Sequence, residues 1–424
     1  MNPLELTDAA PVRRSRLPTA LRERDFRRFW VGETVSLFGD QITLIALPLT
    51  AVLALDASPA QMGYLTAAGI APALIFSLHA GAWLDRRGHR RHAMIVTVLG
   101  RAVLIATIPV AYWLGVLGFV QLYIVAFLIG TLSTFFFIAY TTLFVSLVPR
   151  ERYLEANSLL NGSRAFSFVG GPSVGGLLVQ AFSAPGALAA DAISFLVSAF
   201  TLRSIKPVEP PTELAERGHI RAGLRYLWHS PVIRASLLAT ATINFFNFVF
   251  WALFILYATN TLGVTPGALG LVLGAASIGG VIGSILTGRI SRRLGVGPAF
   301  VLSCVLFPAP LVLVPLAHGP YWLVLAMLFT AEFLSGFGVM ILDIVGGSIK
   351  TALIPDRLRA RVAGSYMVVN YGVRPLGALV GGALGTWIGL RPTLWIASTA
   401  AIAGVLWLLP SPFMRMRELP EVDE

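Results

Sequence analysis

Long apolar stretches separated by short polar junctions make up most of this chain. Stretches of about 20 apolar residues are typical of membrane-spanning helices, and most of these are too long for core helices or barrel strands. They also do not alternate apolar with polar positions. The pattern therefore predicts an all-α integral membrane protein with twelve transmembrane helices. We place the spans near residues 26–53, 62–83, 93–114, 119–147, 154–182, 187–202, 232–260, 268–290, 298–317, 321–353, 362–388 and 393–409.

The composition agrees with a membrane protein. Of the 424 residues, 56% are hydrophobic and 12% charged, with a mean hydropathy of +0.76. Soluble domains carry about 25% charged residues, so a water-soluble enzyme and a disordered chain are both excluded. The single cysteine, Cys304, provides neither a disulfide nor a thiolate metal site. We expect no cofactor and no metal.

Positive charge gathers on one side of the predicted membrane. Of the 32 Lys and Arg residues, 28 lie in the two tails or in every second junction. The opposite junctions, such as 57–60 and 183–186, are short and nearly uncharged. The positive-inside rule therefore predicts a multi-pass protein of the plasma (inner) membrane with both termini in the cytoplasm. The net charge of +11 reflects this topology rather than nucleic-acid binding.

The one sizeable loop divides the chain into two halves. Within it, Gly218–His229 is predicted to form an amphipathic helix on the inner leaflet, because Ile220, Leu224 and Leu227 share one face. The predicted regions are a tail (1–25), a six-helix bundle (26–205), the cytoplasmic loop (206–231), a second six-helix bundle (232–410) and a second tail (411–424).

The two halves resemble each other at an offset of 206–207 residues. Such parallel repetition is typical of transporters whose binding site lies between the halves. A chance coincidence of Gly and Arg is less favoured, because matching residues fall in matching loops and helices. The recurring pairs are Gly171 and Gly377, Gly175 and Gly381, Gly176 and Gly382, Gly81 and Gly288, Arg86 and Arg293, and Gly88 and Gly295.

Two motifs resemble signatures of the major facilitator superfamily. Residues 81–91, GAWLDRRGHRR, are similar to its G-x-L-a-D-r-x-G-r-k loop, and 171–176, GPSVGG, to the G-P-x-x-G-G of its drug/proton antiporters. Residues 39–40, 223–227 and 355–362 resemble its macrolide-efflux and enterobactin-exporter-like branch. The resemblance covers nearly the whole chain. It implies two pseudo-symmetric six-helix bundles that rock about a central site.

Two departures from these patterns limit what the resemblance carries over. The fourth span lacks the intramembrane arginine of many proton antiporters, so a role in proton transfer is not assigned to that helix. In the second half, Arg292 stands where Asp85 would align. The loop of the second half therefore lacks the carboxylate that would form a latch, an ion pair closing the cytoplasmic side, so one of the two expected latches is degenerate.

The resemblance implies a cytoplasmic gate in the first motif. The Asp85 carboxylate can pair with an arginine or a helix N-terminus, and the glycines allow a tight turn. The alternative is a solvated surface pair contributing about 0–1 kcal/mol. The gate residues are Gly81, Asp85, Arg86, Gly88 and Arg90.

The second motif predicts a smooth face on the fifth helix. Gly171, Gly175 and Gly176 allow a neighbouring helix to approach closely, while Pro172 adds a kink. A gating helix and ordinary small-residue packing both fit this pattern.

Ionisable residues inside the spans are the candidate site, because a charge at mid-membrane costs at least ~2.5–3.5 kcal/mol. Asp40 is the preferred proton carrier, since burial raises a carboxyl pKa and a nearby arginine lowers it. The alternative is a static pair joining helix 1 to helix 5 or 11. Arg101 is expected to snorkel, and Glu33 and Asp191 to be interfacial. The other candidates are the charges Arg164, Glu332, Asp343 and Arg374 and the polar residues Ser36, Thr43, Asn161, Asn244, Asn247 and Asn370, on helix faces expected to line a wet cavity.

The energy source is predicted to be a proton gradient. Neither lysine, Lys206 or Lys350, follows a glycine-rich phosphate loop, so ATP is not the driver. We expect a monomeric, proton-coupled exporter of amphipathic small molecules, drug-, macrolide- or siderophore-like, with lipid around it. Import by symport is the first alternative. A membrane-embedded enzyme or a scaffold is remote, because no convergent catalytic cluster is visible.

Overall fold

The computed structural model describes residues 18–206 and 220–419, and within these ranges the chain is helical without strands. The side chains of residues 78–87, 142, 145, 220–224, 356–357 and 360 lie outside the description. The first half contains α1 (Arg24–Leu55), α2 (Pro59–Arg87), α3 (Arg90–Trp113), α4 (Phe119–Leu143), α5 (Tyr153–Phe182) and α6 (Ala184–Arg203), with short 3₁₀ turns at Thr19–Arg22, Phe144–Ser146 and Arg150–Arg152.

The second half repeats this arrangement after a short connecting helix. Ten helical segments are long and apolar enough to cross a membrane, and α13 and α14 with η5 occupy the positions of the remaining two predicted spans. The elements are α7 (Ile220–His229), α8 (Pro231–Asn260), α9 (Pro266–Leu294), α10 (Val296–Leu306), η4 (Ala309–Val312), α11 (Leu313–Leu316), α12 (Tyr321–Leu353), α13 (Asp356–Trp387), α14 (Leu390–Ile402), η5 (Ala403–Trp407) and η6 (Pro412–Arg415).

Prolines and glycines explain several of these boundaries. Helix α9 starts with Pro266 behind Thr265, whose hydroxyl accepts a hydrogen bond from the Ala268 amide at 3.5 Å. The ninth predicted span is interrupted after α10 because Pro308 and Pro310 cannot donate backbone hydrogen bonds.

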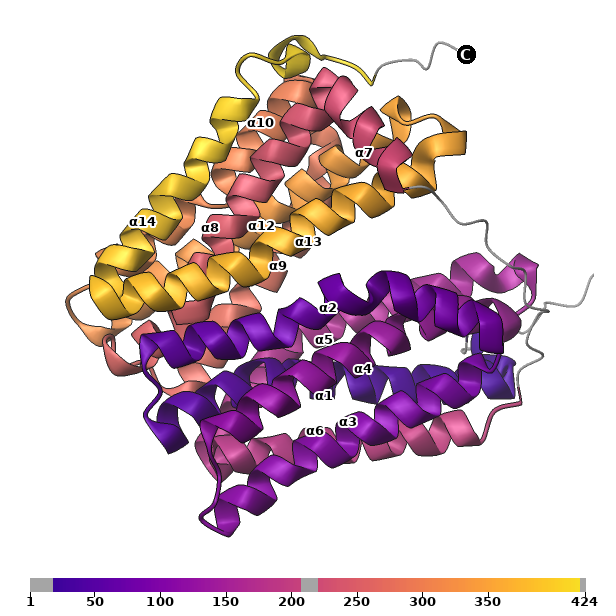
Figure 1. Ribbon diagram of the computed structural model, residues 1–424, viewed down its shortest axis with the longest axis vertical. Helices are drawn as coiled ribbons and strands as arrows, with labels where there is room; N and C mark the ends of the chain where they lie inside the picture. The colour runs from indigo at the N-terminus through magenta and orange to yellow at the C-terminus, as the bar shows by residue number, and fades with distance from the viewer. Residues whose placement is uncertain (1–17, 207–219, 420–424) are drawn as a thin grey trace, which may run out of the picture.

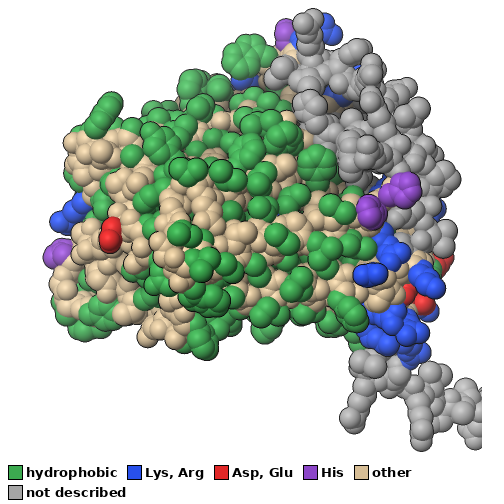
Figure 2. Space-filling view, turned by 60° about the horizontal axis from the view of Figure 1, so that its bottom comes forward, with side chains coloured by type: hydrophobic (Ala, Val, Ile, Leu, Met, Phe, Trp, Pro, Cys, Tyr) green, Lys and Arg blue, Asp and Glu red, His purple; other side chains and the backbone are tan. Residues whose placement is uncertain are grey.

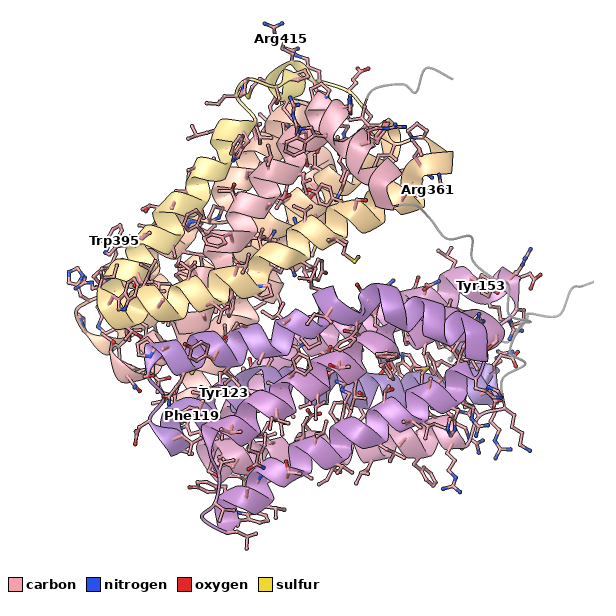
Figure 3. All side chains as sticks on the ribbon, viewed as in Figure 1. Phe119, Tyr123, Tyr153, Arg361, Trp395 and Arg415 are labelled. Carbon is pink, nitrogen blue, oxygen red and sulfur yellow. The ribbon has the colours of Figure 1, made fainter. Side chains whose placement is uncertain are left out.

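The helices form two bundles, α1–α6 and α8–α14, as the sequence predicted (Figure 1). The bundles meet where α2 packs on α13 and α5 packs on α9, and they diverge toward one end. Figure 3 places Tyr153, Arg361 and Arg415 at that end, whereas Phe119, Tyr123 and Trp395 lie toward the other. We call the first the basic end, because Lys and Arg side chains gather there while apolar side chains cover the middle of the face in Figure 2.

Glycines bring the two bundles together at the end opposite the basic end. A Cβ atom on Gly176 of α5 would overlap the carbonyl oxygen of Pro266, the first residue of α9. A Cβ atom on Gly382 of α13 would lie 3.0 Å from the carbonyl oxygen of Pro59, the first residue of α2. Because backbone cannot yield as a flexible side chain does, both contacts depend on glycine.

The internal repeat holds in three dimensions. A Cβ atom on Gly175 would lie 3.1 Å from the Cα of Ile42 on α1, and one on Gly381 would lie 2.6 Å from the carbonyl oxygen of Val249 on α8. The turns after α2 and α9 also match, since Gly88 and Gly295 both adopt positive φ, 69° and 94°. Residues 206–207 apart therefore occupy equivalent places in the two bundles.

Helix α7 packs against the second bundle. Leu227 is 1% exposed, in a cluster with Ile354 and Val362, and the Tyr226 hydroxyl donates to the Leu353 carbonyl oxygen at 2.7 Å. The expectation that Leu227 faces the inner leaflet was therefore wrong. The periodic pattern identified an apolar face, and Leu227 of that face covers protein rather than lipid. The side chains of Ile220 and Leu224 lie outside the described residues.

Candidate functional site

The first bundle holds an ion pair in its interior. Arg101 of α3 donates to the Asp40 carboxylate of α1, and its guanidinium carbon lies 4.0 Å from the ring centre of Phe195 on α6. Arg101 is only 4% exposed. The prediction that Arg101 snorkels was wrong, because a carboxylate partner and an aromatic ring compensate its charge inside the bundle. The partner of Asp40 also comes from α3 rather than from α5 or α13.

A second carboxylate, Asp191 of α6, lies beside this pair and is fully buried. It accepts hydrogen bonds from the Thr43 hydroxyl of α1 and from the Ser194 hydroxyl at 2.9 Å. Glu33, seven residues before Asp40 on α1, is buried as well. The expectation that Asp191 and Glu33 are interfacial was therefore wrong. We call Glu33, Asp40, Thr43, Arg101, Asp191 and Ser194 the N-bundle polar cluster.

The polar stripe of α1, the helix face that carries Glu33, Ser36, Asp40 and Thr43, belongs to or borders this cluster. Ser36 is 2% exposed, and a Cβ atom on Gly39 would overlap the Ser194 side chain of α6. Ser36 is therefore covered inside the first bundle, and the expectation that Ser36 lines a wet cavity was wrong. Gly32 and Gly39 lie on the same face and allow the close approach, which turns a polar stripe into a packing surface.

The second bundle contains a cavity of about 530 Å³ between α8, α10, α12 and α13. Four of the predicted residues line it, namely Asn244, Asp343, Asn370 and Arg374. The lining also includes Lys350 and Arg359, so the cavity extends toward the basic end. We call it the C-bundle cavity. Its other lining residues are Ser236, Thr240, Phe300, Phe307, Val339, Leu342, Gly346, Gly347, Thr351, Ile354, Val362, Ala363, Tyr366, Met367 and Tyr371.

A chain of hydrogen bonds runs along one wall of this cavity. The hydroxyl groups of Thr240 and Tyr366 are 2.6 Å apart, and the Asn370 side-chain amide donates to the Thr240 hydroxyl at 3.2 Å. Arg374 donates to the Asn370 side-chain oxygen at 3.3 Å. Tyr366, Asn370 and Arg374 follow at four-residue spacing, so they share one face of α13. This network fixes the orientation of the polar wall.

The charges in the cavity rest on aromatic rings. The Lys350 ammonium lies 4.3 Å from the Tyr366 ring centre, and the Arg374 guanidinium carbon lies 3.9 Å from that of Tyr371. Asp343 lines the same cavity and forms no ion pair with either cation among the described residues. Both cations are therefore held in place without being neutralised.

Other predicted residues lie outside this cavity. Glu332 was expected to share a face with Asp343, but it is 2% exposed and its Oε1 atom has no hydrogen-bond partner among the described residues. Asn247 is buried with an unpartnered side-chain nitrogen. On α5, Arg164 is half-buried and Asn161 exposed. Glu332 and Asn247 are thus interior residues of the second bundle.

The gate motif is described only in part. The side chains of Gly81, Asp85 and Arg86 lie outside the described residues, whereas Gly88 forms the turn with positive φ and Arg90 begins α3. In the other motif, Gly171 and Gly175 pack on α1, and Gly176 packs on α9 of the other bundle. Pro172 lies inside α5 and is buried.

Three further cavity residues, which helical periodicity could have identified, were not among the predicted ones. On α13, Tyr366 lies four residues before Asn370, and Tyr371 lies three residues before Arg374. On α12, Lys350 lies seven residues after Asp343. Helical neighbours at three, four and seven residues share a face, so each was within reach of the same argument.

Comparison with known proteins decides the family. The chain matches the Major Facilitator Superfamily over residues 29–331 and 237–423. It belongs to this superfamily. Among superfamily members it is similar to the multidrug efflux pump Tap of Mycolicibacterium fortuitum, with 28% identity over 408 residues, 90% of this chain and 93% of Tap. As a member of this superfamily, the chain is a multi-pass membrane transporter of small molecules.

Solved superfamily structures share the fold. A mutant of the nucleoside transporter NupG superposes with a TM-score of 0.75 at 11% identity, covering 93% of this chain and 100% of that one. A bacterial homologue of the iron transporter ferroportin, in an inward-facing state, superposes with a TM-score of 0.74 at 16% identity, covering 92% of this chain and 98% of that one. At these identities the likeness concerns the superfamily fold alone.

Proposed function

We propose that this transporter exports amphipathic small molecules across the plasma membrane in exchange for protons, acting as a monomer. The observation that carries the proposal is the C-bundle cavity, where charged and aromatic side chains face a space of about 530 Å³, within the range of small-molecule sites. The similarity to a multidrug efflux pump over 90% of the chain favours export over import.

The basic end is taken as cytoplasmic, following the positive-inside rule. The bundles diverge at that end and meet through Gly176 and Gly382 at the other. In this arrangement the C-bundle cavity is open to the cytoplasm, where an exporter loads its substrate. Rocking about the α5–α9 and α2–α13 contacts then moves the opening to the other side, and the glycine faces are the surfaces that separate.

Proton coupling is assigned to the N-bundle polar cluster. Asp40 is the member that is partly accessible, with 38% of its side chain exposed against 5% for Arg101. Protonation of Asp40 removes the negative charge that compensates Arg101 and leaves a buried cation beside Asp191. Because an unpaired buried charge is costly, this step favours a different packing of α1 against α3 and α6. A static ion pair, the alternative, would hold the helices together without responding to protons.

The direction and the driving force are tested together in membrane vesicles. A fluorescent amphipathic dye is added to the medium around inside-out vesicles that contain the protein. A proton gradient with an acidic vesicle interior is then imposed. Accumulation that a protonophore abolishes supports the proposal. Dye leaving pre-loaded inside-out vesicles together with protons would instead identify an importer working by symport.

Asp40→Asn provides the specific test of coupling, with Asp56→Asn as the matched control. Asp56 carries the same carboxylate just after the C-terminal end of α1, exposed and in a left-handed conformation that Asn tolerates. Asp40→Asn should lose gradient-driven accumulation at least tenfold while still exchanging labelled for unlabelled dye. Accumulation by Asp40→Asn that keeps its dependence on the proton gradient would remove Asp40 from the coupling role.

A further inference from the structure

We infer that the C-bundle cavity selects amphipathic substrates that carry an anionic group, a carboxylate or a phosphate, bound between Lys350 and Arg374. This inference rests on the proposed function, because it names the substrate class of the same cavity. The structural basis is two cations, Lys350 and Arg374, that form no ion pair among the described residues and lie beside aromatic surface, in a space sized for a small molecule.

The charges lining the cavity are unequal. Two cations that rest on tyrosine rings, Lys350 and Arg374, line it with one described carboxylate, Asp343. Arg359 lines the cavity toward the basic end and donates to the Thr351 carbonyl oxygen at 3.3 Å. The summed field of the two cations and Asp343 attracts an anion and opposes the entry of a cation. A lone carboxylate beside two cations is a poor anchor for a cationic drug.

Arg374 has donors left for a ligand. It donates to Asn370 and interacts with Tyr371, while its buried Nε atom has no hydrogen-bond partner among the described residues. A guanidinium offers a planar fork of N–H groups that matches the two oxygens of a carboxylate or phosphate. Stacking on Tyr371 fixes the plane of that fork before a ligand arrives, so little side-chain entropy is lost on binding.

Lys350 completes the anion site from the opposite helix. It projects from α12 over the ring of Tyr366, whose hydroxyl is held by Thr240. Neither Lys350 nor Arg374 is paired with Asp343, so an entering anion displaces no ion pair among the described residues. The cation–π contacts position both cations and leave their charge available.

The apolar part of the substrate has its own surface. Phe300 of α10 and Phe307, the residue after that helix, line the same cavity, with Val339 and Met367 from α12 and α13. These side chains suit an aromatic or aliphatic group attached to the anion. The cavity thus combines an anion-binding wall with an apolar wall, which is the arrangement that recognises an amphipathic anion.

Asp343 makes the assignment sharply testable. If the substrate is an anion, Asp343 repels it, and Asp343→Asn should tighten binding. If the substrate is a cation, Asp343 is its one described carboxylate partner in the cavity, and the same variant should abolish binding. The two substrate classes therefore predict opposite signs for one substitution.

The experiment uses the full chain in lipid nanodiscs and three probes with one aromatic scaffold, measured by calorimetry. The probes are 1-naphthaleneacetate, its neutral amide and 2-(1-naphthyl)ethylamine. We expect the anion to bind at least tenfold more tightly than the amide, and the amine more weakly still. Arg374→Gln and Lys350→Gln should each reduce binding of the anion about tenfold with little effect on the amide, and Asp343→Asn should increase it.

The controls separate a charge effect from misfolding. Arg415→Gln removes an exposed charge in the C-terminal segment and should bind all three probes as the wild type does. If Arg374→Gln fails to fold, Arg374→Lys keeps the charge but not the fork, and should weaken the carboxylate probe alone. Equal binding of all three probes, or tighter binding of the amine with loss in Asp343→Asn, would overturn the assignment.

The outcome also separates this inference from the proposed function. Proton-driven export of a cationic dye, without preference for the anionic probe, would support the proposed exporter and contradict the anionic substrate class. Selective binding of the anion without gradient-driven transport would support the anionic substrate class and contradict proton-driven export.

Discussion

The two bundles share a scaffold but use their polar residues differently. Equivalent glycines, Gly175 and Gly381, seat the fifth helix of each half on the first. In the first bundle the charges lie inside, where Asp40 pairs with Arg101. In the second bundle they line a cavity, where Lys350 and Arg374 rest on tyrosine rings. Repetition has preserved the packing, and the two halves have taken different electrostatic roles.

Residues at equivalent positions of the two halves show this difference in detail. Glu33 and Arg164 of the first half correspond to Thr240 and Asn370 of the second, which are joined by a hydrogen bond of 3.2 Å. Two charged residues in the first half thus stand where the second half has two neutral residues joined by a hydrogen bond. Asp40 likewise corresponds to Asn247, which is neutral and buried. Under the proposed function, the first half carries the groups that exchange protons and the second carries the groups that contact a ligand.

The largest expected effect comes from removing the buried arginine. Arg101→Met leaves Asp40 without its partner inside the first bundle, so it should destabilise the protein by about 3–5 kcal/mol. The equivalent loss in the cavity, Arg374→Met, should cost about 0–1 kcal/mol, because that cation is half-buried and has no ion pair among the described residues. Thermal unfolding in detergent measures both. Equal losses of stability in the two variants would contradict the claim that the first bundle buries a paired charge while the second holds unpaired charges in a cavity.

A smaller effect is expected at the contact between the bundles. Gly176→Leu should separate α5 from α9 and shift the transporter toward the state open at the other end, reducing transport at least tenfold in folded protein. Gly162→Leu on the same helix is the control, since a Cβ atom there meets nothing within 4 Å. Accessibility of single cysteines on the two sides reports the shift. Unchanged accessibility in Gly176→Leu would contradict the role of this contact.

The two loops after α2 and α9 offer an intermediate comparison. Asp85→Asn should lower transport several-fold at unchanged expression and thermal stability, because it removes the carboxylate of the proposed latch. Arg292→Gln alters the aligned position of the degenerate loop and should have little effect. Transport rates in proteoliposomes decide the matter. Full activity of Asp85→Asn would reject the latch.

The smallest expected effect is a gain in stability. Asn247 holds an unpartnered side-chain nitrogen in the interior of the second bundle, so Asn247→Leu should stabilise the protein by about 1 kcal/mol or leave it unchanged. Thermal unfolding is again the measurement. A marked loss of stability would show that Asn247 has a polar partner in another state of the cycle.

Much of the fold could be predicted from the sequence, because span length, charge asymmetry and repeated glycines are local properties. The α13 face that carries Asn370 and Arg374 followed from the repeat and from helical spacing. The partner of Asp40 did not, since periodicity shows which residues share a face but not which helix that face meets. For the same reason the stripe through Ser36 was assigned to a cavity, although Gly39 in the same stripe allows α6 to cover it.

The most direct test of the central claim, that the first bundle couples protons and the second binds substrate, crosses two variants with two assays. Asp40→Asn and Arg374→Gln are each measured for equilibrium binding of the anionic probe and for its gradient-driven uptake into inside-out vesicles. Asp40→Asn should bind within about twofold of the wild type and lose driven uptake, whereas Arg374→Gln should lose both. Loss of binding in Asp40→Asn to the same degree as in Arg374→Gln would contradict the division between the bundles.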